Sequence, residues 1–383
     1  MAAVSRLGWA GDLVLSSRPA FLPSAHGGGP YQAGGHAPEN PWVLVQIERE
    51  PAQQWVVAEG GNPRRHTRLS RTRIAGSAAV ARQLPALVEI ATAEAQPRAR
   101  SVYLPSGTHI RLLAVPVTDS VGRVAAVQAW AGPRSRPIPA RPAVGVISWL
   151  EPATGLAVTT PAAETLLDTG TTGGATRPLA DLLGRLAVLE DRLGLLQLLD
   201  PAADRHRWSA LAVSRGHASA TARSLFLAAT RHADPPGVTS VVCDVSAAHP
   251  PAPTPVSELL VRAVPAPRRH GIAVVDLATG LVHDWIRPAP EPVHRWRRQH
   301  PIIHPHDQVR LAETRTRLIG GAPRAALRWR LRFEPADRWT CIHTRWTVLT
   351  RTPTPQAMLD IRLANPRIVE TWAAPDDHGE EPL

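Results

Sequence analysis

Apolar and polar residues alternate most clearly in the last third of the chain, between residues 302 and 349. There Leu327, Trp329, Leu331 and Phe333 are separated by Arg328, Arg330 and Arg332. A period of two predicts a strand whose apolar face is buried and whose arginines point outward. Two more strands are predicted over residues 339–349 and 358–363, so this region should form an antiparallel meander.

A helix is predicted just before this meander. Asp307 suits its N-cap, and Gly320 and Gly321 suit its C-terminal end. The four residues His304 to Asp307 (His-Pro-His-Asp) form the loop that leads into it. The pattern therefore predicts one amphipathic helix followed by strands.

Two earlier regions show related patterns. The first predicts strands over residues 42–47 and 55–58, a helix within residues 64–99, and a hairpin over residues 109–132. The second predicts a hairpin over residues 145–160, a helix from Pro161, and three strands over residues 207–214, 220–230 and 238–246. Its leucine-rich stretch, residues 179–199, is read as one longer helix, which could pack on its own sheet or form a dimer seam.

An internal repeat links the second and third regions. The sequences GVISWLEPATGLAVTT from Gly145 and GIAVVDLATGLVHDWI from Gly271 share a strand, an Ala-Thr-Gly-Leu turn and a second strand. This repeat predicts that both regions have one fold. We therefore expect an α+β protein of three domains, each an antiparallel sheet with helices packed on it.

Proline-rich segments set the expected boundaries. The predicted units are a flexible N-terminal tail over residues 1–39, a domain over 40–132, a linker over 133–142, a domain over 143–246, a Pro-rich linker over 247–268, a domain over 269–366, and an acidic tail over 367–383.

Charge changes this picture little. The net charge is +11, and every basic residue other than histidine is arginine, because the chain has no lysine. A nucleic-acid or acidic-membrane partner would explain such a charge. High genomic GC content also explains it, and the even spread of arginine along the chain favours that explanation. The sequence shows no apolar run long enough to span a membrane, and we expect a cytoplasmic protein with Cys243 and Cys341 reduced.

The sequence contains no recognised catalytic motif, so we expect no enzyme, no catalytic residues and no metal site. Four histidines lie close together in sequence: His294, His300, His304 and His306. Imidazoles can bind haem or another metal group, but no supporting cysteine or carboxylate pattern accompanies them. No cofactor is predicted, and haem or another ligand is unsupported.

Tryptophans are concentrated in the third region. They could line a cavity for a flat apolar ligand or simply fill the core. The candidate ligand-binding residues are Trp285, Trp329, His343 and Trp346.

The helix after the His-Pro-x-Asp loop, the following meander and the two repeated hairpins resemble PAS sensor domains. The segment AVPV…GRVAAVQAW, within residues 114–130, resembles the closing hairpin of GAF domains. The order GAF-like, PAS-like, PAS-like without an output domain resembles the mycobacterial triple sensor-domain proteins. This resemblance implies a non-catalytic sensor or adaptor in signal transduction.

The same resemblance sets the expected partners. They are a small-molecule ligand, an unidentified effector protein and a second copy of the chain in a homodimer; no membrane and no nucleic acid is expected. The alternative function is a nucleic-acid-associated transcriptional regulator that uses an arginine-rich surface.

Overall fold

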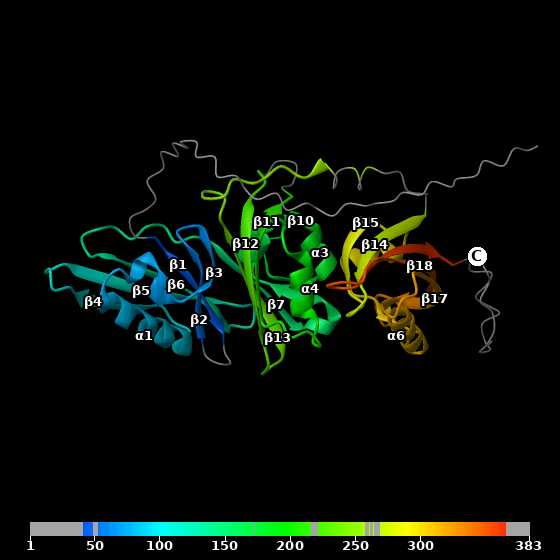
Figure 1. The fold of residues 1–383 in the computed structure, drawn as a ribbon, viewed down its shortest axis with the longest axis horizontal. Coiled ribbons are helices and arrows are strands. Elements are labelled where there is room, and N and C mark those ends of the chain that lie inside the picture. Colours follow the sequence, from blue (N-terminus) through cyan, green and yellow to red (C-terminus); the bar gives the residue numbers. More distant parts are fainter. Residues whose placement is uncertain are drawn as a thin grey trace, which may run out of the picture. The chain divides into compact units, whose positions relative to one another are not determined.

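A computed structural model describes residues 41–48, 53–171, 173–215, 221–256, 260, 263 and 269–364. The predicted N-terminal tail, the acidic tail and part of the second linker lie outside these residues. The described residues form three antiparallel sheets with a few helices (Figure 1). The expected α+β class with three antiparallel sheets is confirmed at this level. None of the described helices has the length and apolar character needed to cross a membrane.

The first sheet has the order β3-β2-β1-β6-β5-β4. Its strands are β1 (Val43–Glu48), β2 (Gln53–Glu59), β3 (Asn62–Thr67), β4 (Arg98–Tyr103), β5 (His109–Thr118) and β6 (Val124–Pro133). Two helical turns, η1 (Leu69–Arg71) and η2 (Arg73–Ala75), lead into helix α1 (Ala78–Glu94), which is capped by Ser77. The strands β3 and β4 occupy residues that the sequence pattern assigned to the helical region.

The second sheet has the order β10-β11-β12-β13-β7-β8-β9. Its strands are β7 (Val144–Glu151), β8 (Leu156–Thr159), β9 (Ala175–Pro178), β10 (Leu186–Leu189), β11 (Arg207–Ser214), β12 (Ser224–His232) and β13 (Gly237–Asp244). The expected long helix over residues 179–199 is wrong. The chain there forms α3 (Leu179–Gly184), β10 and α4 (Arg192–Leu199), because a run of leucines fits a buried strand as well as a buried helix. The turn η3 (Pro152–Thr154) and helix α2 (Pro161–Leu166) complete this part.

The third sheet has the order β15-β14-β19-β18-β17-β16. Its strands are β14 (His270–Asp276), β15 (Val282–Arg287), β16 (Ile302–Ile303), β17 (Arg324–Arg332), β18 (Thr340–Thr350) and β19 (Gln356–Leu363). The turn η4 (Val293–Arg297) and helix α6 (Pro305–Ile319) connect the hairpin to the meander. The predicted inward residues of β17 are all buried, and Gly320 caps the end of α6 as expected.

The three sheets share one strand order. In each sheet the first strand in the chain pairs with the last one. The strands before the last one then follow beside it in reverse chain order. The repeated turns also agree in detail. Gly155 and Gly280 both have positive φ, 66° and 80°, and the hydroxyls of Thr154 and Thr279 each accept a hydrogen bond from the N–H of the leucine two residues on. The predicted repeat of the hairpin is therefore confirmed.

A second pair of glycines is equivalent in the two hairpins. A Cβ atom on Gly145 would lie within 3.0 Å of backbone atoms of Ala163, and one on Gly271 would do the same at Ala289. In both hairpins the glycine therefore lets the segment that follows the hairpin pack directly on the backbone of the first strand. A side chain at the glycine position would not fit there.

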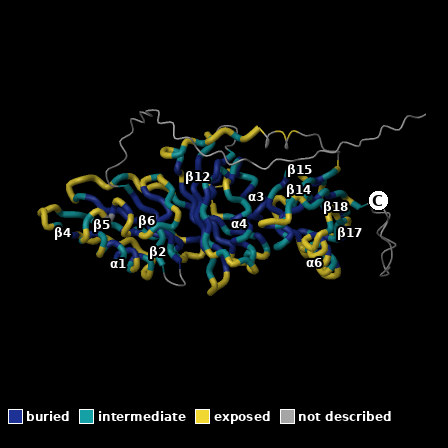
Figure 2. Tube along the Cα trace, viewed as in Figure 1, coloured by how far each residue is buried: buried dark blue, intermediate teal, exposed yellow. Residues whose placement is uncertain are grey.

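The first two sheets are packed against each other. On β12, Leu225, Leu227 and Ala229 belong to the core beneath the helices of the second sheet. Phe226 and Ala228 belong to another core, which also contains residues of the first sheet such as Leu44 and Val57. Figure 2 accordingly shows β12 buried along most of its length. Both faces of this strand are covered, so its sequence is almost continuously apolar.

Polar contacts join the same two sheets. The Arg207 side chain of β11 forms an ion pair with the buried Glu48 of β1, with Nη2 and Oε2 2.9 Å apart. The Trp55 indole donates to the same carboxylate at 2.8 Å, and the Arg207 guanidinium lies 4.3 Å from the Trp55 ring centroid. The predicted domain boundaries stay predictions, but the first two domains would not have fully separate cores.

Candidate functional site

The tryptophans of the predicted ligand site lie in the hydrophobic core that packs on the third sheet. Trp285, Trp329 and Trp346 are all buried in its core. The indole N–H groups of Trp329 and Trp346 both donate to the Thr344 hydroxyl at 3.0 Å, and that hydroxyl donates to the Leu327 carbonyl at 3.0 Å. A hydroxyl has one donor and two acceptor positions. All three are occupied, so this pair of indoles has a structural partner already.

Trp285 differs from the other two. Its indole N–H is buried and has no hydrogen-bond partner among the described residues. Trp296 of η4 lies between Trp285 and Trp329, with ring centroids 5.8 and 5.6 Å away and edge-to-face geometry. The sequence analysis did not select Trp296 as a site residue, although it packs between two residues that were selected.

His343 does not join this cluster. Ile342, Thr344 and Trp346 of β18 point into the core, so His343 points to the opposite face of the sheet. The structure thus brings together three of the four predicted residues and separates the fourth. The period of two that placed Trp346 inside also places His343 outside.

Two of the four histidines, His304 and His306, lie at the start of α6, whereas His294 lies in η4 and His300 precedes β16. The His304 and His306 rings stack with centroids 5.4 Å apart, and His304 lies 4.7 Å from the Trp339 ring. Burial, followed by the charge of Arg330, lowers the pKa of His304. Within the described residues, no three His, Cys, Asp or Glu side chains are placed to hold a metal ion.

A buried carboxylate anchors the hairpin of the second sheet. Glu164 of α2 is fully buried, and Arg177 of β9 donates to it through Nε and Nη2 at 2.7–3.0 Å. The hydroxyls of three threonines also donate to it: Thr159, Thr169 and Thr171. Burial favours a raised pKa, but these hydrogen bonds outweigh it and lower the pKa of Glu164 to about 2. Such a satisfied ion pair stabilises the fold and has no free group for chemistry.

A second buried polar chain lies beside the third hairpin. His283 Nε2 and Gln356 Oε1 are 2.6 Å apart, and Gln356 Nε2 donates to Asp276 at 3.0 Å. Thr279 donates to the same carboxylate from its hydroxyl, at 2.6 Å. Burial raises the pKa of Asp276 and lowers the pKa of His283 to about 4. These groups hold the Ala-Thr-Gly-Leu turn against β19.

A cavity of about 200 Å³ lies where the first sheet meets the second. The β5–β6 turn contributes Asp119 and Arg123, and strand β7 contributes Trp149 and Leu150. The β12–β13 hairpin contributes the remaining lining residues: His232, Pro235, Pro236, Gly237, Val238 and Thr239. The sequence pattern predicted a hairpin over residues 109–132 and two strands on either side of residues 231–237, but it gave no sign that these two connections meet.

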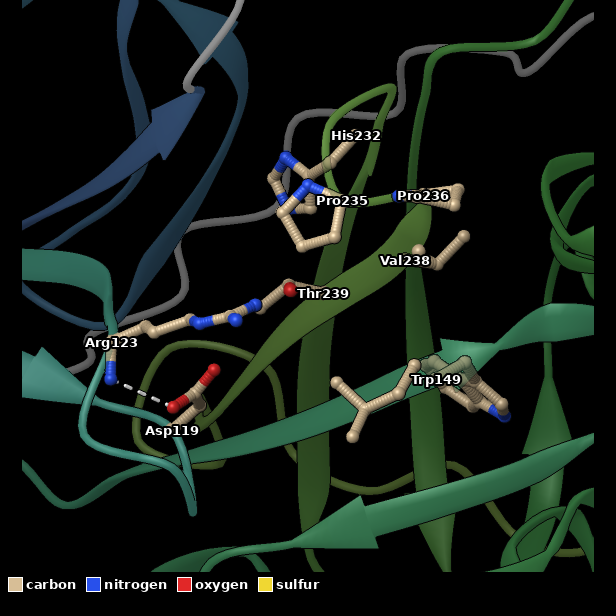
Figure 3. A pocket seen from close by; sticks show the side chains of 10 residues that line it. Asp119, Arg123, Trp149, His232, Pro235, Pro236, Val238 and Thr239 are labelled. Atoms are coloured by element: carbon tan, nitrogen blue, oxygen red, sulfur yellow. Dashed lines mark hydrogen bonds between the residues drawn. The ribbon is translucent and has the colours of Figure 1, made fainter.

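The turn around Asp119 fixes the position of Arg123. Asp119 Oδ1 accepts from the backbone N–H groups of Val121 and Arg123 at 3.0 and 2.9 Å. Figure 3 shows the Arg123 side chain extending from this turn toward Thr239 of β13. Within the described residues the guanidinium forms no hydrogen bond or ion pair. This arrangement offers fork-shaped donors, a hydroxyl and an apolar wall, which suits binding of a small anion better than catalysis.

Comparisons with known proteins agree with this fold. Residues 41–140, which contain the first sheet, match the family model described as Rv3651-like, N-terminal. A crystal structure of an uncharacterised protein from Mycobacterium tuberculosis is 19% identical and has a TM-score of 0.67, covering 88% of this chain and 99% of that one. The chain therefore shares its fold with this mycobacterial protein over most of its length. No curated protein matches the chain.

Two other solved structures match less well. An RNA-binding light-oxygen-voltage receptor is 11% identical with a TM-score of 0.22, covering 60% of this chain and 99% of that one. The E. coli DhaR(N)–DhaL complex is 15% identical with a TM-score of 0.17, covering 55% of this chain and 80% of that one. Scores this low carry no argument, so the GAF and PAS assignments stay predictions.

Proposed function

We propose that the protein is a non-catalytic sensor or adaptor in signal transduction, built from one GAF-like and two PAS-like modules. The common strand order of the three sheets supports this proposal, as does the equivalent hairpin in the second and third sheets. The helix α6 that follows the His-Pro-His-Asp loop and leads into a meander supports it for the third sheet.

The proposed ligand is a small anion, and its proposed site is the cavity between the first two sheets. The carrying observation is Arg123, whose guanidinium extends from the first sheet toward Thr239 of the second (Figure 3). A ligand held there would contact both sheets. Its binding free energy could then favour one packing of the two sheets over another, which is how a binding site becomes a sensor.

The tryptophan cluster is the weaker ligand site. Its indole donors at Trp329 and Trp346 are already bound to Thr344, and the buried Trp285 N–H lacks a partner among the described residues. One unpaired donor in a packed core gives a ligand little to recognise.

The test is thermal unfolding of the full chain with and without acetate, succinate and inorganic phosphate. A ligand that binds only the folded state stabilises it by RT ln(1 + c/Kd), where c is the free ligand concentration, and so raises the melting temperature as c exceeds Kd. We expect one of these anions to raise it for the wild type and for Arg134→Gln, a change at an exposed arginine outside the cavity. Arg123→Gln should abolish the rise. An equal rise in all three proteins, or none in the wild type, would exclude this site.

A further inference from the structure

The outward face of the third sheet carries a group of arginines at matched positions. Arg328 of β17, His343 of β18 and Arg362 of β19 lie directly opposite one another in the register. Arg345 of β18 lies opposite Ala326, so it is diagonal to both Arg324 and Arg328. Directly paired residues of a sheet have Cβ atoms about 5 Å apart, and diagonal ones are about 7–8 Å apart. We call these five residues the arginine face.

Most of this charge has no counter-charge among the residues that the structure describes. Asp360 lies within the face, directly opposite Arg345 in the register, and it pairs with Arg362 at 3.3 Å and with His270 at 3.1 Å. Arg324, Arg328 and Arg345 are exposed and form no hydrogen bond or ion pair from their side chains within the described residues.

Two more carboxylates stand near the far edge of the sheet. Asp284 pairs with Arg192 at 3.0 Å, and Asp276 is buried against Thr279 and Gln356. Neither of them neutralises the arginine face.

The excess of positive charge acts on His343, which lies among these arginines. Burial lowers the pKa of His343, and the charges of Arg328, Arg345 and Arg362 lower it further. The charge of Asp360 opposes them and is too small to reverse the shift. Three strands therefore bring positive charge close enough to His343 to disfavour its protonation.

We propose that the arginine face is a docking surface for a carboxylate-rich segment of a partner protein. A guanidinium binds a carboxylate through two parallel hydrogen bonds, and three unpaired guanidinium groups on neighbouring strands can take several carboxylates at once. This inference is independent of the cavity at Arg123, because it concerns another sheet and another partner.

The same face is poorly suited to nucleic acid. Sheets that bind single strands stack bases on aromatic side chains. Here the tryptophans of β15, β17 and β18 point into the core, and histidines are the only aromatic residues at the register positions of the arginine face. A positively charged surface without tryptophan, tyrosine or phenylalanine side chains for base stacking favours carboxylates over nucleobases.

The experiment measures binding of a fluorescein-labelled oligoglutamate peptide to the full chain by anisotropy, at low and physiological salt. The face variant is Arg324→Gln, Arg328→Gln and Arg345→Gln together. The control variant removes the same charge from the exposed residues Arg65, Arg68 and Arg71 near β3. We expect the face variant to weaken binding by about tenfold, since each exposed pair contributes modestly, and the control variant to change it less than about twofold.

Three outcomes would overturn the proposal. Equal losses in both variants would mean attraction to net charge alone. Tighter binding of an oligouridylate probe, lost in the face variant, would make the face a nucleic-acid surface. The third outcome involves the acidic residues near the C-terminus: Asp376, Asp377, Glu380 and Glu381. If replacing these four by their amides in the full chain strengthened peptide binding about tenfold, the chain itself would be the occupant.

In support, the pKa of His343, followed by NMR, should rise when the oligoglutamate peptide binds, because carboxylates would offset the neighbouring arginines. The control variant should show the same rise. An unchanged His343 titration at saturating peptide would contradict docking on this face.

Discussion

Arg330 and Asp307 hold the meander of the third sheet to the helix that precedes it. The backbone N–H and the side-chain Nε of Arg330 both donate to Asp307 Oδ2 at 2.9 Å, and the Asp307 side chain is 2% exposed. The sequence pattern predicted Asp307 as an N-cap and Arg330 as an outward residue. The first expectation is wrong, because His304 occupies the N-cap of α6 and Asp307 turns to the strand instead. Arg330 does alternate with the buried Trp329 and Leu331, but its ion pair with Asp307 was not predicted.

Asp307→Ala should lower the free energy of unfolding by about 3 kcal/mol, because it leaves a partly buried guanidinium and a strand N–H without their acceptor. Arg330→Ala should cost about 2 kcal/mol, because the buried carboxylate keeps only the strand N–H and the ion pair to Arg310 at 3.8 Å. The measurement is urea unfolding, with Arg328→Ala as the control at the exposed position two residues earlier; this change should cost less than about 0.5 kcal/mol. Equal stability of all three variants would contradict the role of this pair.

Thr344→Val should cost about 2 kcal/mol, because the change is close to isosteric but leaves the buried indole N–H groups of Trp329 and Trp346 without an acceptor. Thr347→Val, on the opposite face of β18, is the matched control and should cost much less. Near-ultraviolet circular dichroism should also change only in the first variant, since the indoles would reorient. If both variants unfolded at the same urea concentration, the hydrogen bonds at the Thr344 hydroxyl would not stabilise the fold.

Stability should fall in acid through Glu164. Its pKa is about 2 in the folded protein, against an ordinary value of 4.5, so this carboxylate stabilises the fold above pH 4.5. That stabilisation, on the order of 3 kcal/mol, is lost as the pH falls from about 4.5 to about 2. The free energy of unfolding of Glu164→Gln should therefore depend less steeply on pH in this range. Glu313→Gln, at an exposed position on α6, should retain the wild-type slope.

Acidification should cause a second loss of stability through His283, and this loss should begin at a higher pH than the one at Glu164. Burial lowers its pKa from 6.5 to about 4, so the folded protein holds it neutral while the unfolded chain binds a proton first. Stability is therefore fully present above pH 6.5 and is lost as the pH falls toward about 4, by about 2 kcal/mol between pH 7 and pH 5. Urea unfolding of His283→Gln at these two pH values should show a smaller difference than wild type. His206→Gln, at an exposed histidine, should not reduce it.

Limited proteolysis within residues 133–142 should cut the chain without separating its parts. The Trp42 indole donates to the Pro139 carbonyl at 3.0 Å, and Gln128 donates to the Pro142 carbonyl at 2.8 Å. The apolar core shared by the first two sheets should keep the fragments together in size-exclusion chromatography. Elution of a free N-terminal fragment would mean that the two sheets are independent modules.

The parts of the fold that were predictable depend on short-range patterns. Alternation placed Leu327, Trp329 and Leu331 in the core correctly, because a strand position and its face follow from neighbouring residues. The leucines of residues 179–199 recur every three or four residues throughout, so the pattern predicted one helix and the break into α3, β10 and α4 was not visible. Glu164 was overlooked because its partner Arg177 lies on another element, and burial of a charge depends on that partner.

The candidate site was less predictable for the same reason. The tryptophans were concentrated in one region of sequence, but their distance from His343 is decided by the face on which each residue lies. The cavity at Arg123 and the arginine face depend on pairings between strands or sheets far apart in the chain. Register and sheet packing are non-local, and one sequence contains little information on them.

Gly145 and Gly271 limit how far the two repeated hairpins can diverge. Any other residue at either position must displace the backbone at Ala163 or Ala289, so substitution there is blocked in each copy separately. The strands around them differ at most positions, and the segment that lies on the glycine is a helix in one copy and a connection without regular secondary structure in the other. These two positions should therefore stay glycine in natural variants of this chain, and they give a fixed reference for aligning the second sheet with the third when little else in the sequences agrees.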